Sequence, residues 1–357
     1  MARRVETRIE DPLGDEDLEV PFKYAITAYG ADFPVDGLVK RLVEKSIEMP
    51  DFQRGYVWTN TRASRFVESL LLGLPVPGIF LAREPASQAL LVIDGQQRLR
   101  SLQYFYRGTF PQTEKVFRLR GVQKQFEGLQ YEELPKADRR RLDDSIIHAT
   151  VVKQDDPSDD QSSIYHIFER INTGGVQLHA QEIRTSIYHG SICTLLAELN
   201  VTDDWRELYG PISKTMRDQE LILRFFAFLY YRSDYARPMK DFLNKAMGRR
   251  RQANAATIED MRKRFMETMA LIRRVLGNKA FRPKRALNAA VFDAVAVSVA
   301  ESLAGKSKAA VDAFERKLRT KYQALLLDTD FQAAVNKSTA DEEGVRSRFA
   351  IATSTIK

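Results

Sequence analysis

An apolar run at residues 90–93 passes directly into the polar pentapeptide Asp94-Gly95-Gln96-Gln97-Arg98 and then into a helical pattern. The run Leu90-Leu91-Val92-Ile93 has the length and apolar character of a buried strand. The apolar residues after the pentapeptide recur at the spacing of one helix face: Leu99, Leu102, Phe105 and Tyr106. The pentapeptide is therefore predicted at a strand-to-helix junction, which requires an α/β arrangement here.

Such a junction suits an anion, because the first N–H groups of a helix and the positive end of its dipole point the same way. Gly95 permits a tight turn, and Gln96 and Gln97 offer amide donors. Arg98 can grip a phosphate with two parallel hydrogen bonds, and Asp94 can hold a metal ion or orient Arg98. The alternative is an ordinary turn in which Asp94 only caps the helix.

A second polar segment, residues 51–58, places Gln53 and Arg54 among three aromatic residues just before a predicted helix. The aromatic residues are Phe52, Tyr56 and Trp58. They could stack on a base or line a phosphate pocket. Taken alone, the segment favours the alternative that the aromatic side chains belong to the core and Arg54 to a surface ion pair.

A third segment ends the helix predicted for residues 163–171 with Asn172-Thr173-Gly174-Gly175. A helix that stops in this way exposes backbone groups and the Asn172 carboxamide to a cleft. The alternative is an ordinary glycine-terminated helix.

Strand and helix patterns alternate up to about residue 190, and only helical patterns follow. Strand patterns cover residues 23–28, 79–81, 90–93, 116–119 and 146–152. Helical patterns cover residues 35–47, a segment capped by Thr59 or Thr61 that ends near residue 72, 163–171, 220–231, 239–247, 257–276 with a Thr257–Asp260 capping box, 286–303 and 309–327. We therefore predict an α+β chain with a flexible acidic leader (1–20), an α/β domain (21–190) and an all-α domain (191–357).

The net charge of +7 is unevenly distributed. Residues 237–285 hold fifteen Lys and Arg against four acids, a net charge of +11, and few acids are interspersed to neutralise them. The basic residues singled out are Arg249, Arg250, Arg251, Arg262, Lys263, Arg264, Arg273, Arg274, Lys284 and Arg285. Such a surface, here called the basic block, is expected to bind DNA phosphates without reading sequence. The alternative is a solvated helical face whose basic stems cover apolar neighbours.

Several classes of protein are excluded by composition. The single cysteine, Cys193, rules out an internal disulfide framework and a thiolate zinc cluster. The four histidines lie between residues 148 and 189 without a regular zinc spacing. The acidic N-terminus lacks the apolar region of a signal peptide, and charged or polar residues interrupt the most apolar stretch, 286–303. A cytoplasmic protein without a membrane segment is expected.

These segments together resemble the N-terminal domain of GmrSD-type, modification-dependent restriction systems, which is also found in a phosphorothioate-sensing antiphage protein. The resemblance rests on ordered motifs between about residues 22 and 230. They are Gln53-Arg54 with Trp58, Asp94-Gly95-Gln96-Gln97-Arg98-Leu99, Phe168-x-Arg170-x-Asn172-x-Gly174-Gly175 with Leu178 and Glu182, Arg217-Asp218-Gln219-Glu220, and Leu223-Arg224-Phe225-Phe226.

The resemblance implies a ParB/sulfiredoxin-like fold whose Gly-x-x-Arg turn binds nucleotide phosphates, and hydrolysis of a nucleoside triphosphate coupled to DNA sensing. It assigns the nucleotide site to Gly95 and Arg98, with Gln53 and Arg54 across a cleft and Asn172 as a contributor. It assigns catalysis to Asp94, Gln96, Gln97 and Arg98. Many relatives carry an HNH-type nuclease, which needs histidine, and no histidine follows His189 in this chain.

The sequence thus leads to two hypotheses. The first is an NTP-hydrolysing sensor of a restriction or antiphage system, which uses Mg²⁺ bound near Asp94, binds possibly modified DNA and acts with a separate nuclease or effector. The second is a non-catalytic DNA-binding or scaffold protein that uses the turn at Asp94–Arg98 as a phosphate clamp. The nucleotide, the DNA modification, the effector and the state of self-association, including a homo-oligomer, stay open.

Overall fold

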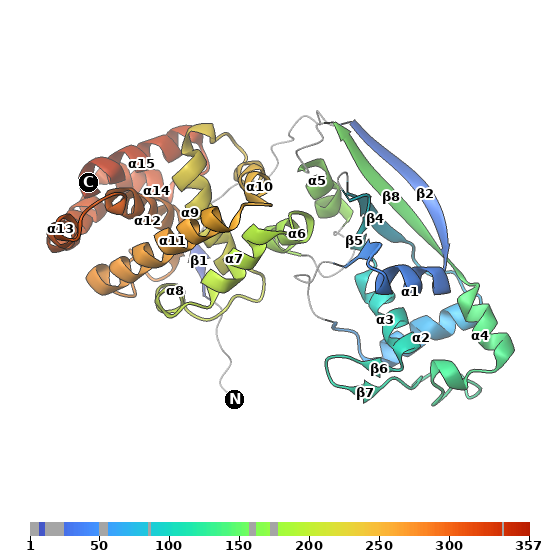
Figure 1. Ribbon diagram of the computed structural model, residues 1–357. Coiled ribbons are helices and arrows are strands. Elements are labelled where there is room, and N and C mark those ends of the chain that lie inside the picture. Colours follow the sequence, from blue (N-terminus) through green and yellow to red (C-terminus); the bar gives the residue numbers. More distant parts are fainter. Residues whose placement is uncertain are drawn as a thin grey trace. The chain divides into compact units, whose positions relative to one another are not determined.

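A computed structural model describes residues 7–10, 25–49, 56–84, 87–156, 162–171, 178–337 and 339–357. The chain divides into two compact units. The sheet unit comprises residues 22–177 with 185–187, and the helical unit comprises residues 1–21, 178–184 and 188–357. Figure 1 labels the helices and strands of each unit.

A five-stranded mixed sheet forms the centre of the sheet unit, in the order β2-β8-β4-β5-β3. Its strands are β2 (Ala25–Pro34), β3 (Ile47–Glu48), β4 (Ile79–Arg83), β5 (Leu90–Asp94) and β8 (Ile146–Asp156). β5 pairs antiparallel with β4 and parallel with β3, and β8 pairs antiparallel with β2 and parallel with β4. A separate hairpin consists of β6 (Thr109–Phe110) and β7 (Lys115–Val116).

Both faces of β5 are buried, which explains its uninterrupted apolar sequence. Leu90 and Val92 belong to the main apolar core, while Leu91 and Ile93 are buried outside that core. Side chains alternate between faces along a strand, so the two pairs lie on opposite faces. Packing on both faces therefore fixes the strand that ends at the exposed Asp94.

The helices of the sheet unit are α1 (Val35–Val43), α2 (Asn60–Leu71), α3 (Gln96–Arg107), α4 (Lys136–Asp143) and α5 (Ser162–Ile171), with a 3₁₀ turn at Tyr131–Glu133. The apolar stripes of α1, α2 and α3 share one core with Leu142 of α4. Thr59 caps α2, and its side chain accepts a hydrogen bond from the Arg62 N–H. α5 packs against β5 and β8.

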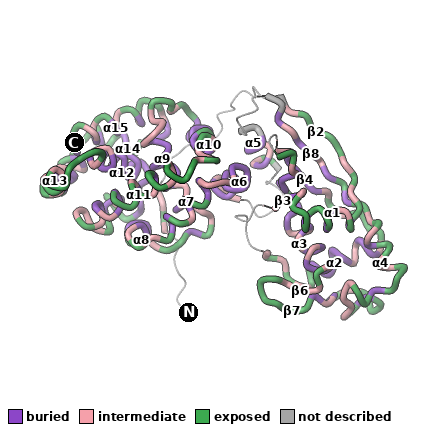
Figure 2. Tube along the Cα trace, viewed as in Figure 1, coloured by how far each residue is buried: buried purple, intermediate pink, exposed green. Residues whose placement is uncertain are grey.

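Over its described residues, the helical unit consists of helices apart from one short strand pair. Its elements are α6 (Ala180–Ile187, whose last three residues belong to the sheet unit), α7 (Ser191–Asn200), α8 (Asp203–Tyr209), α9 (Arg217–Tyr231), a 3₁₀ turn (Arg232–Asp234), α10 (Met239–Arg250), α11 (Ala255–Leu276), α12 (Ala289–Leu303), α13 (Lys308–Leu327), α14 (Thr329–Asn336) and α15 (Glu342–Ile356). α12 lies at the centre and is buried along almost its whole length, whereas α13 exposes much of its surface (Figure 2).

The predicted fold class is confirmed: the chain is α+β, with a mixed sheet in the N-terminal region and helices in the C-terminal part. The short strand pair is the exception, since β1 (Ile9–Glu10) pairs in parallel with β9 (Leu287–Asn288). The sequence analysis did not predict this pairing. In addition, no described helix is long and apolar enough to cross a membrane.

Three local predictions are wrong. Ile47 does not extend the first helix, because α1 ends at Val43 and Ile47 pairs with Leu90 in the sheet. The strand expected at residues 116–119 is confined to the pair Lys115–Val116. The cap of α11 is Asn254, whose side chain accepts from the Thr257 N–H, rather than Thr257.

Candidate functional site

Gly95 turns the chain from β5 into α3. It occupies the N-cap position of α3 with φ +100° and ψ 4°, a left-handed conformation that favours glycine. The N-cap is Gly95, which has no side chain, so the alternative in which Asp94 serves as the cap is wrong. The start of a helix directs its first N–H groups toward any acceptor placed there, whether a ligand or water.

The turn is also closely packed. A Cβ atom at Gly95 would lie 2.9 Å from the Ile79 Cβ atom, closer still to the Ile79 Cγ2 atom, and 3.4 Å from the Arg98 Nη2 atom. Ile79 is buried at the start of β4 and cannot withdraw easily. Glycine is therefore required at this position for its conformation and for its size.

We expect Gly95→Ala to lower the free energy of unfolding of the sheet unit by about 2–4 kcal/mol, because left-handed strain and overpacking add. Gly73→Ala is the matched control, since Gly73 has φ +68° but no atom within 4 Å of an added Cβ. The control should cost only about 1 kcal/mol. Urea unfolding followed by the fluorescence of Trp58 measures both, and equal losses would contradict the packing argument.

Arg98 is held at the turn by two acceptors. Its Nη2 atom donates to the Gly78 carbonyl oxygen at 2.9 Å and to Asp94 Oδ2 at 2.7 Å. The Arg98 side chain is 16% exposed, while that of Asp94 is 53% exposed. The buried Arg98 Nε atom has no hydrogen-bond partner among the described residues. The structure thus joins Asp94, Gly95 and Arg98 in one cluster with an unused donor.

The two glutamines differ in their surroundings. Gln97 Oε1 accepts hydrogen bonds from the N–H groups of Val57 at 3.0 Å and Trp58 at 3.3 Å. Gln96 is 9% exposed, and its buried Nε2 atom has no partner within the described residues. Gln97 therefore fixes the segment at residues 57–58, which follows Gln53 and Arg54 in the sequence, whereas Gln96 keeps an unused amide donor.

Three predicted site residues, Gln53, Arg54 and Asn172, lie outside the described residues. Of their neighbours, Tyr56 donates to or accepts from the Ser101 hydroxyl at 2.7 Å and Trp58 lies edge-on to Phe66. Both rings are half-buried against the core, as the alternative interpretation of this segment expects. Phe168, on the third motif, is buried in α5.

Residues 38–189 match the family model of the GmrSD restriction endonuclease N-terminal domain. The predicted resemblance is confirmed over these residues, which include the Asp94–Arg98 turn. An uncharacterized protein of Methanocaldococcus jannaschii is 33% identical over 99 aligned residues, which cover 21% of this chain and 17% of that protein's length. The GmrSD match ends before Arg217, so the motifs at residues 217–226 stay outside it.

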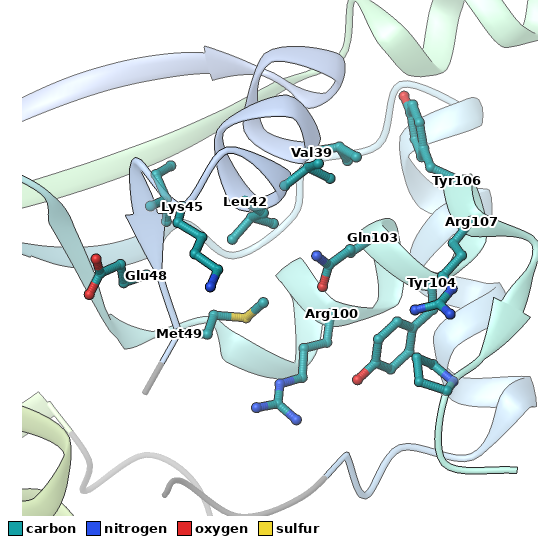
Figure 3. Close-up of a pocket in the computed structure, with 13 residues that line it drawn as sticks. Val39, Leu42, Lys45, Glu48, Met49, Arg100, Gln103, Tyr104, Tyr106 and Arg107 are labelled. Atoms are coloured by element: carbon teal, nitrogen blue, oxygen red, sulfur yellow. The ribbon is translucent and has the colours of Figure 1, made fainter. Parts of the chain in front are cut away.

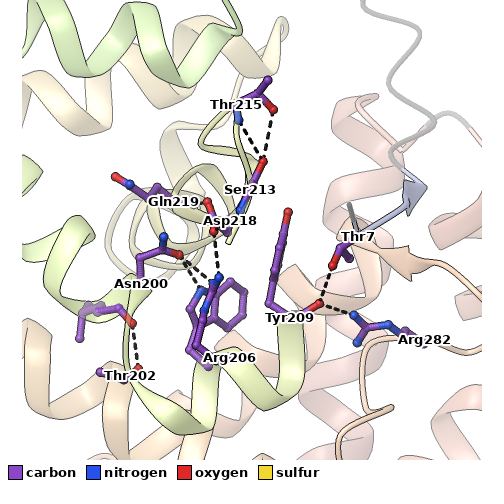
Figure 4. Close-up of polar contacts among 12 residues, drawn as sticks. Thr7, Asn200, Thr202, Arg206, Tyr209, Ser213, Thr215, Asp218, Gln219 and Arg282 are labelled. Atoms are coloured by element: carbon purple, nitrogen blue, oxygen red, sulfur yellow. Dashed lines mark hydrogen bonds and ion pairs between the residues drawn. The ribbon is translucent and has the colours of Figure 1, made fainter. Parts of the chain in front are cut away.

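The motif residues 217–226 lie on α9 of the helical unit, C-terminal to the GmrSD match. Asp218 is fully buried and accepts hydrogen bonds from Arg206 Nη1 at 3.0 Å and from the Ser213 N–H at 2.9 Å (Figure 4). Arg206 also donates to Asn200 Oδ1 at 2.8 Å. Asp218 thereby fixes the start of α9 against α8, which is a structural role.

Glu220 has a comparable role. It accepts a hydrogen bond from Arg184 Nη1 of α6 at 2.7 Å, and Arg184 Nε donates to Asn244 Oδ1 at 2.8 Å. Burial raises the pKa of the Glu220 carboxyl, but the positive charges of Arg184, His179 and Arg224 outweigh burial and hold that pKa below its usual value. The carboxylate therefore stays charged in the folded protein.

His179 should make the stability of the helical unit depend on pH. Burial lowers the pKa of its imidazole, which accepts a hydrogen bond from Arg217 Nε at 3.0 Å. Because the folded pKa lies below the unfolded value of about 6.5, this stability is present above pH 6.5 and is lost as the pH falls. His179→Gln keeps an acceptor for Arg217 and should unfold in urea with a weaker pH dependence between about pH 7 and pH 5. A pH profile that equals that of the wild type would contradict this assignment.

Most residues of the basic block form ion pairs, some with neighbouring acids on α11 and others with acids that are distant in the sequence. The ion pairs join Arg249 to Asp234, Arg262 to Glu198 and Glu259, Lys263 to Glu267, Arg264 to Asp260, Arg273 to Asp204 and Glu207, and Arg274 to Glu315. Glu198, Asp204 and Glu315 come from α7, α8 and α13. Few acids are interspersed within the block, but acids from other parts of the chain add to its neutralisation.

The remaining members of the block divide into two groups. Arg251 donates to the His189 carbonyl oxygen at 3.0 Å, and the Arg250 guanidinium lies over the Tyr230 ring. Lys284 and Arg285 are exposed and have no ion pair among the described residues. DNA binding by this block stays a prediction.

Sequence reasoning missed two contributors to the turn. Gly78 supplies the carbonyl that holds Arg98, and Ile79 supplies the wall against Gly95. Gly78 directly precedes β4, and Ile79 is its first residue. The strand pattern at residues 79–81 predicts β4, but it does not reveal the contacts of either residue with the turn.

Proposed function

We propose that this chain is a nucleotide-binding, NTP-hydrolysing sensor or regulator of a modification-dependent restriction or antiphage system. The observation that carries the proposal is the start of α3, where the N-cap is Gly95 and the Arg98 guanidinium lies beside it. The GmrSD match over residues 38–189 supports the restriction context.

The turn suits a triphosphate for two physical reasons. The start of a helix offers several N–H donors and a positive dipole end to one anion. The Arg98 side chain adds a fixed positive charge, and its Nε atom is an unused donor in the described structure. Phosphoryl transfer depends mainly on positioning and charge neutralisation, both of which this arrangement supplies.

Mg²⁺ fits the carboxylate beside the turn. Asp94 Oδ2 binds Arg98, while the Oδ1 atom has no partner in the described part of the chain and the side chain is half-exposed. Mg²⁺ often binds through one or two carboxylates plus phosphate oxygens and waters, so a single carboxylate is sufficient. When bound, the ion neutralises charge on the phosphates.

The two glutamines are assigned different tasks in this proposal. Gln96 has an unused amide donor at the start of α3 and would orient water or a phosphate oxygen. Gln97 is a positioning residue, because its carboxamide oxygen is engaged with the backbone of Val57 and Trp58. It would hold the backbone at Val57 and Trp58 in place beside α3.

DNA cleavage is assigned to a separate effector. An HNH-type site needs histidine, and the sequence after His189 contains none. In this proposal the nucleotide state of the sheet unit controls that effector in response to DNA.

A non-catalytic phosphate clamp is the second candidate. It is favoured by the engagement of Gln97, which leaves the largely buried Gln96 as the one glutamine of the turn whose amide is unused among the described residues. A clamp needs donors and a positive charge but no residue that orients attacking water.

Phosphate release decides between the two candidates. The full-length protein is incubated with each ribonucleoside triphosphate and Mg²⁺, with and without duplex DNA. The proposal expects inorganic phosphate to be released with at least one nucleotide. Absence of release under every condition, with DNA still bound, would reject hydrolysis and leave the clamp.

A further inference from the structure

A groove of about 810 Å³ runs along one side of α3 in the sheet unit (Figure 3). One wall consists of the end of α1 and the segment through β3, and it carries Lys45 and Glu48. The other wall is the middle and end of α3, with Arg100, Gln103 and Arg107. These residues are separate from the Asp94–Arg98 cluster.

No cation that lines this groove forms an ion pair with a described residue. Lys45, Arg100 and Arg107 form no hydrogen bond or salt bridge among the described residues. In the same part of the chain, Glu48 is the single acid that lines the groove, against three cations. The groove thus differs from the basic block, where most of the cations are neutralised by carboxylates.

The spacing of the arginines suits a polymer of phosphates. Arg100 and Arg107 are seven residues apart, so their Cα atoms are separated by about 10.5 Å along the helix axis. This distance equals the rise of about three nucleotides in one strand of a duplex. Gln103 lies between them on the same wall and can donate to a phosphate oxygen, and the apolar Val39 and Leu42 line the groove beside Lys45.

We propose that this groove binds the phosphodiester backbone of duplex DNA, through Lys45 on one wall and Arg100 and Arg107 on the other. Arginine is well suited to phosphate because its planar fork donates two hydrogen bonds at once. The contact reads no sequence and orients the sheet unit on the duplex. The inference deepens the proposed function, on which it rests, by placing DNA on the same unit as the nucleotide turn.

The test measures binding of a fluorescent duplex by anisotropy over a range of salt concentrations. Arg100→Gln/Arg107→Gln is compared with Arg316→Gln/Lys317→Gln, which removes two exposed cations of α13 that have no ion pair among the described residues. The groove variant should bind about tenfold more weakly than the control. Its salt dependence should fall by about 0.9 for each phosphate contact removed. Lys45→Gln, on the opposite wall, should show a smaller loss in the same direction.

Two results would overturn the inference. One is that the groove variant binds the duplex with the affinity and salt dependence of the control. The other is that a poly-aspartate peptide, and not the duplex, binds through the same residues, which would identify a protein partner instead.

Phosphate release from the same samples separates this inference from the proposed function. If the groove variant loses DNA binding and no sample releases phosphate, hydrolysis is rejected and the groove is retained. If phosphate is released but the groove variants bind DNA as tightly as the control, the groove is rejected and hydrolysis is retained.

Discussion

Replacement of Arg98 by alanine should abolish nucleotide turnover while leaving the protein folded. An arginine that neutralises charge on a transferring phosphoryl group contributes about 10³–10⁵ in rate, so we expect a loss of at least about 10³-fold in kcat/KM. The folded state should tolerate the change, because the Asp94 carboxylate left behind is half-exposed and can be hydrated. Phosphate release under saturating Mg²⁺ measures the effect.

Two further variants show whether the guanidinium itself matters. Arg98→Lys keeps the positive charge but loses the planar fork, and we expect it to recover only a small part of the activity. Arg316→Ala is the control for an exposed arginine elsewhere in the chain, and it should release phosphate at the wild-type rate. Normal turnover in Arg98→Ala would reject the assignment of phosphate binding to this turn.

Asp293→Asn should strongly destabilise the helical unit. Asp293 is 0% exposed and accepts hydrogen bonds from Arg224 at 2.5 and 3.1 Å and from Arg348 at 3.3 Å. Both arginines are also buried, at 1% and 0% exposure. Loss of the carboxylate leaves two buried cations without their counter-charge, which costs about 3–5 kcal/mol.

Urea unfolding followed by Trp205 fluorescence measures this loss, because Trp205 is buried in the helical unit. Asp312→Asn is the matched control, since Asp312 is exposed on α13 and has no ion pair among the described residues. The control should change the free energy of unfolding by less than about 0.5 kcal/mol. An Asp293→Asn protein as stable as the control would show that the arginines find other partners or water.

The site turn was predictable because local sequence determines it. The apolar run before Asp94 requires a strand, the spacing after Arg98 requires a helix face, and Gly95 supplies the conformation that joins them. The same local logic predicts a cap at Thr59 or Thr61, and the structure shows Thr59 in that role, with its side chain accepting from the residue three positions later. Contacts between residues only a few positions apart in the chain can be predicted from sequence patterns.

The remaining features depend on partners far apart in the chain. Ile47 fits a helical apolar stripe, but its pairing with Leu90 removes it from the helix. The basic block looks unneutralised between residues 237 and 285, because its partners Glu198 and Glu315 lie before and after it. A pattern over a short stretch of the sequence cannot include partners that lie this far away along the chain.

The groove beside α3 was missed for a different reason. Arg100 and Arg107 follow each other at the spacing of one helix face, so the sequence does carry a signal. Whether a cation is free depends on the acids around it in space, and only the folded chain shows that these arginines have no partner among the described residues. Charge density along the sequence is therefore a weaker guide than unpaired charge in the structure.

The central claim is that the Gly95–Arg98 turn holds the phosphates of a nucleoside triphosphate. A crystal structure of the protein with Mg²⁺ and a non-hydrolysable triphosphate analogue tests it most directly. We expect phosphate oxygens within hydrogen-bond distance of the first N–H groups of α3 and of the Arg98 guanidinium. Phosphates bound elsewhere in the protein, with this turn in contact only with solvent, would contradict it.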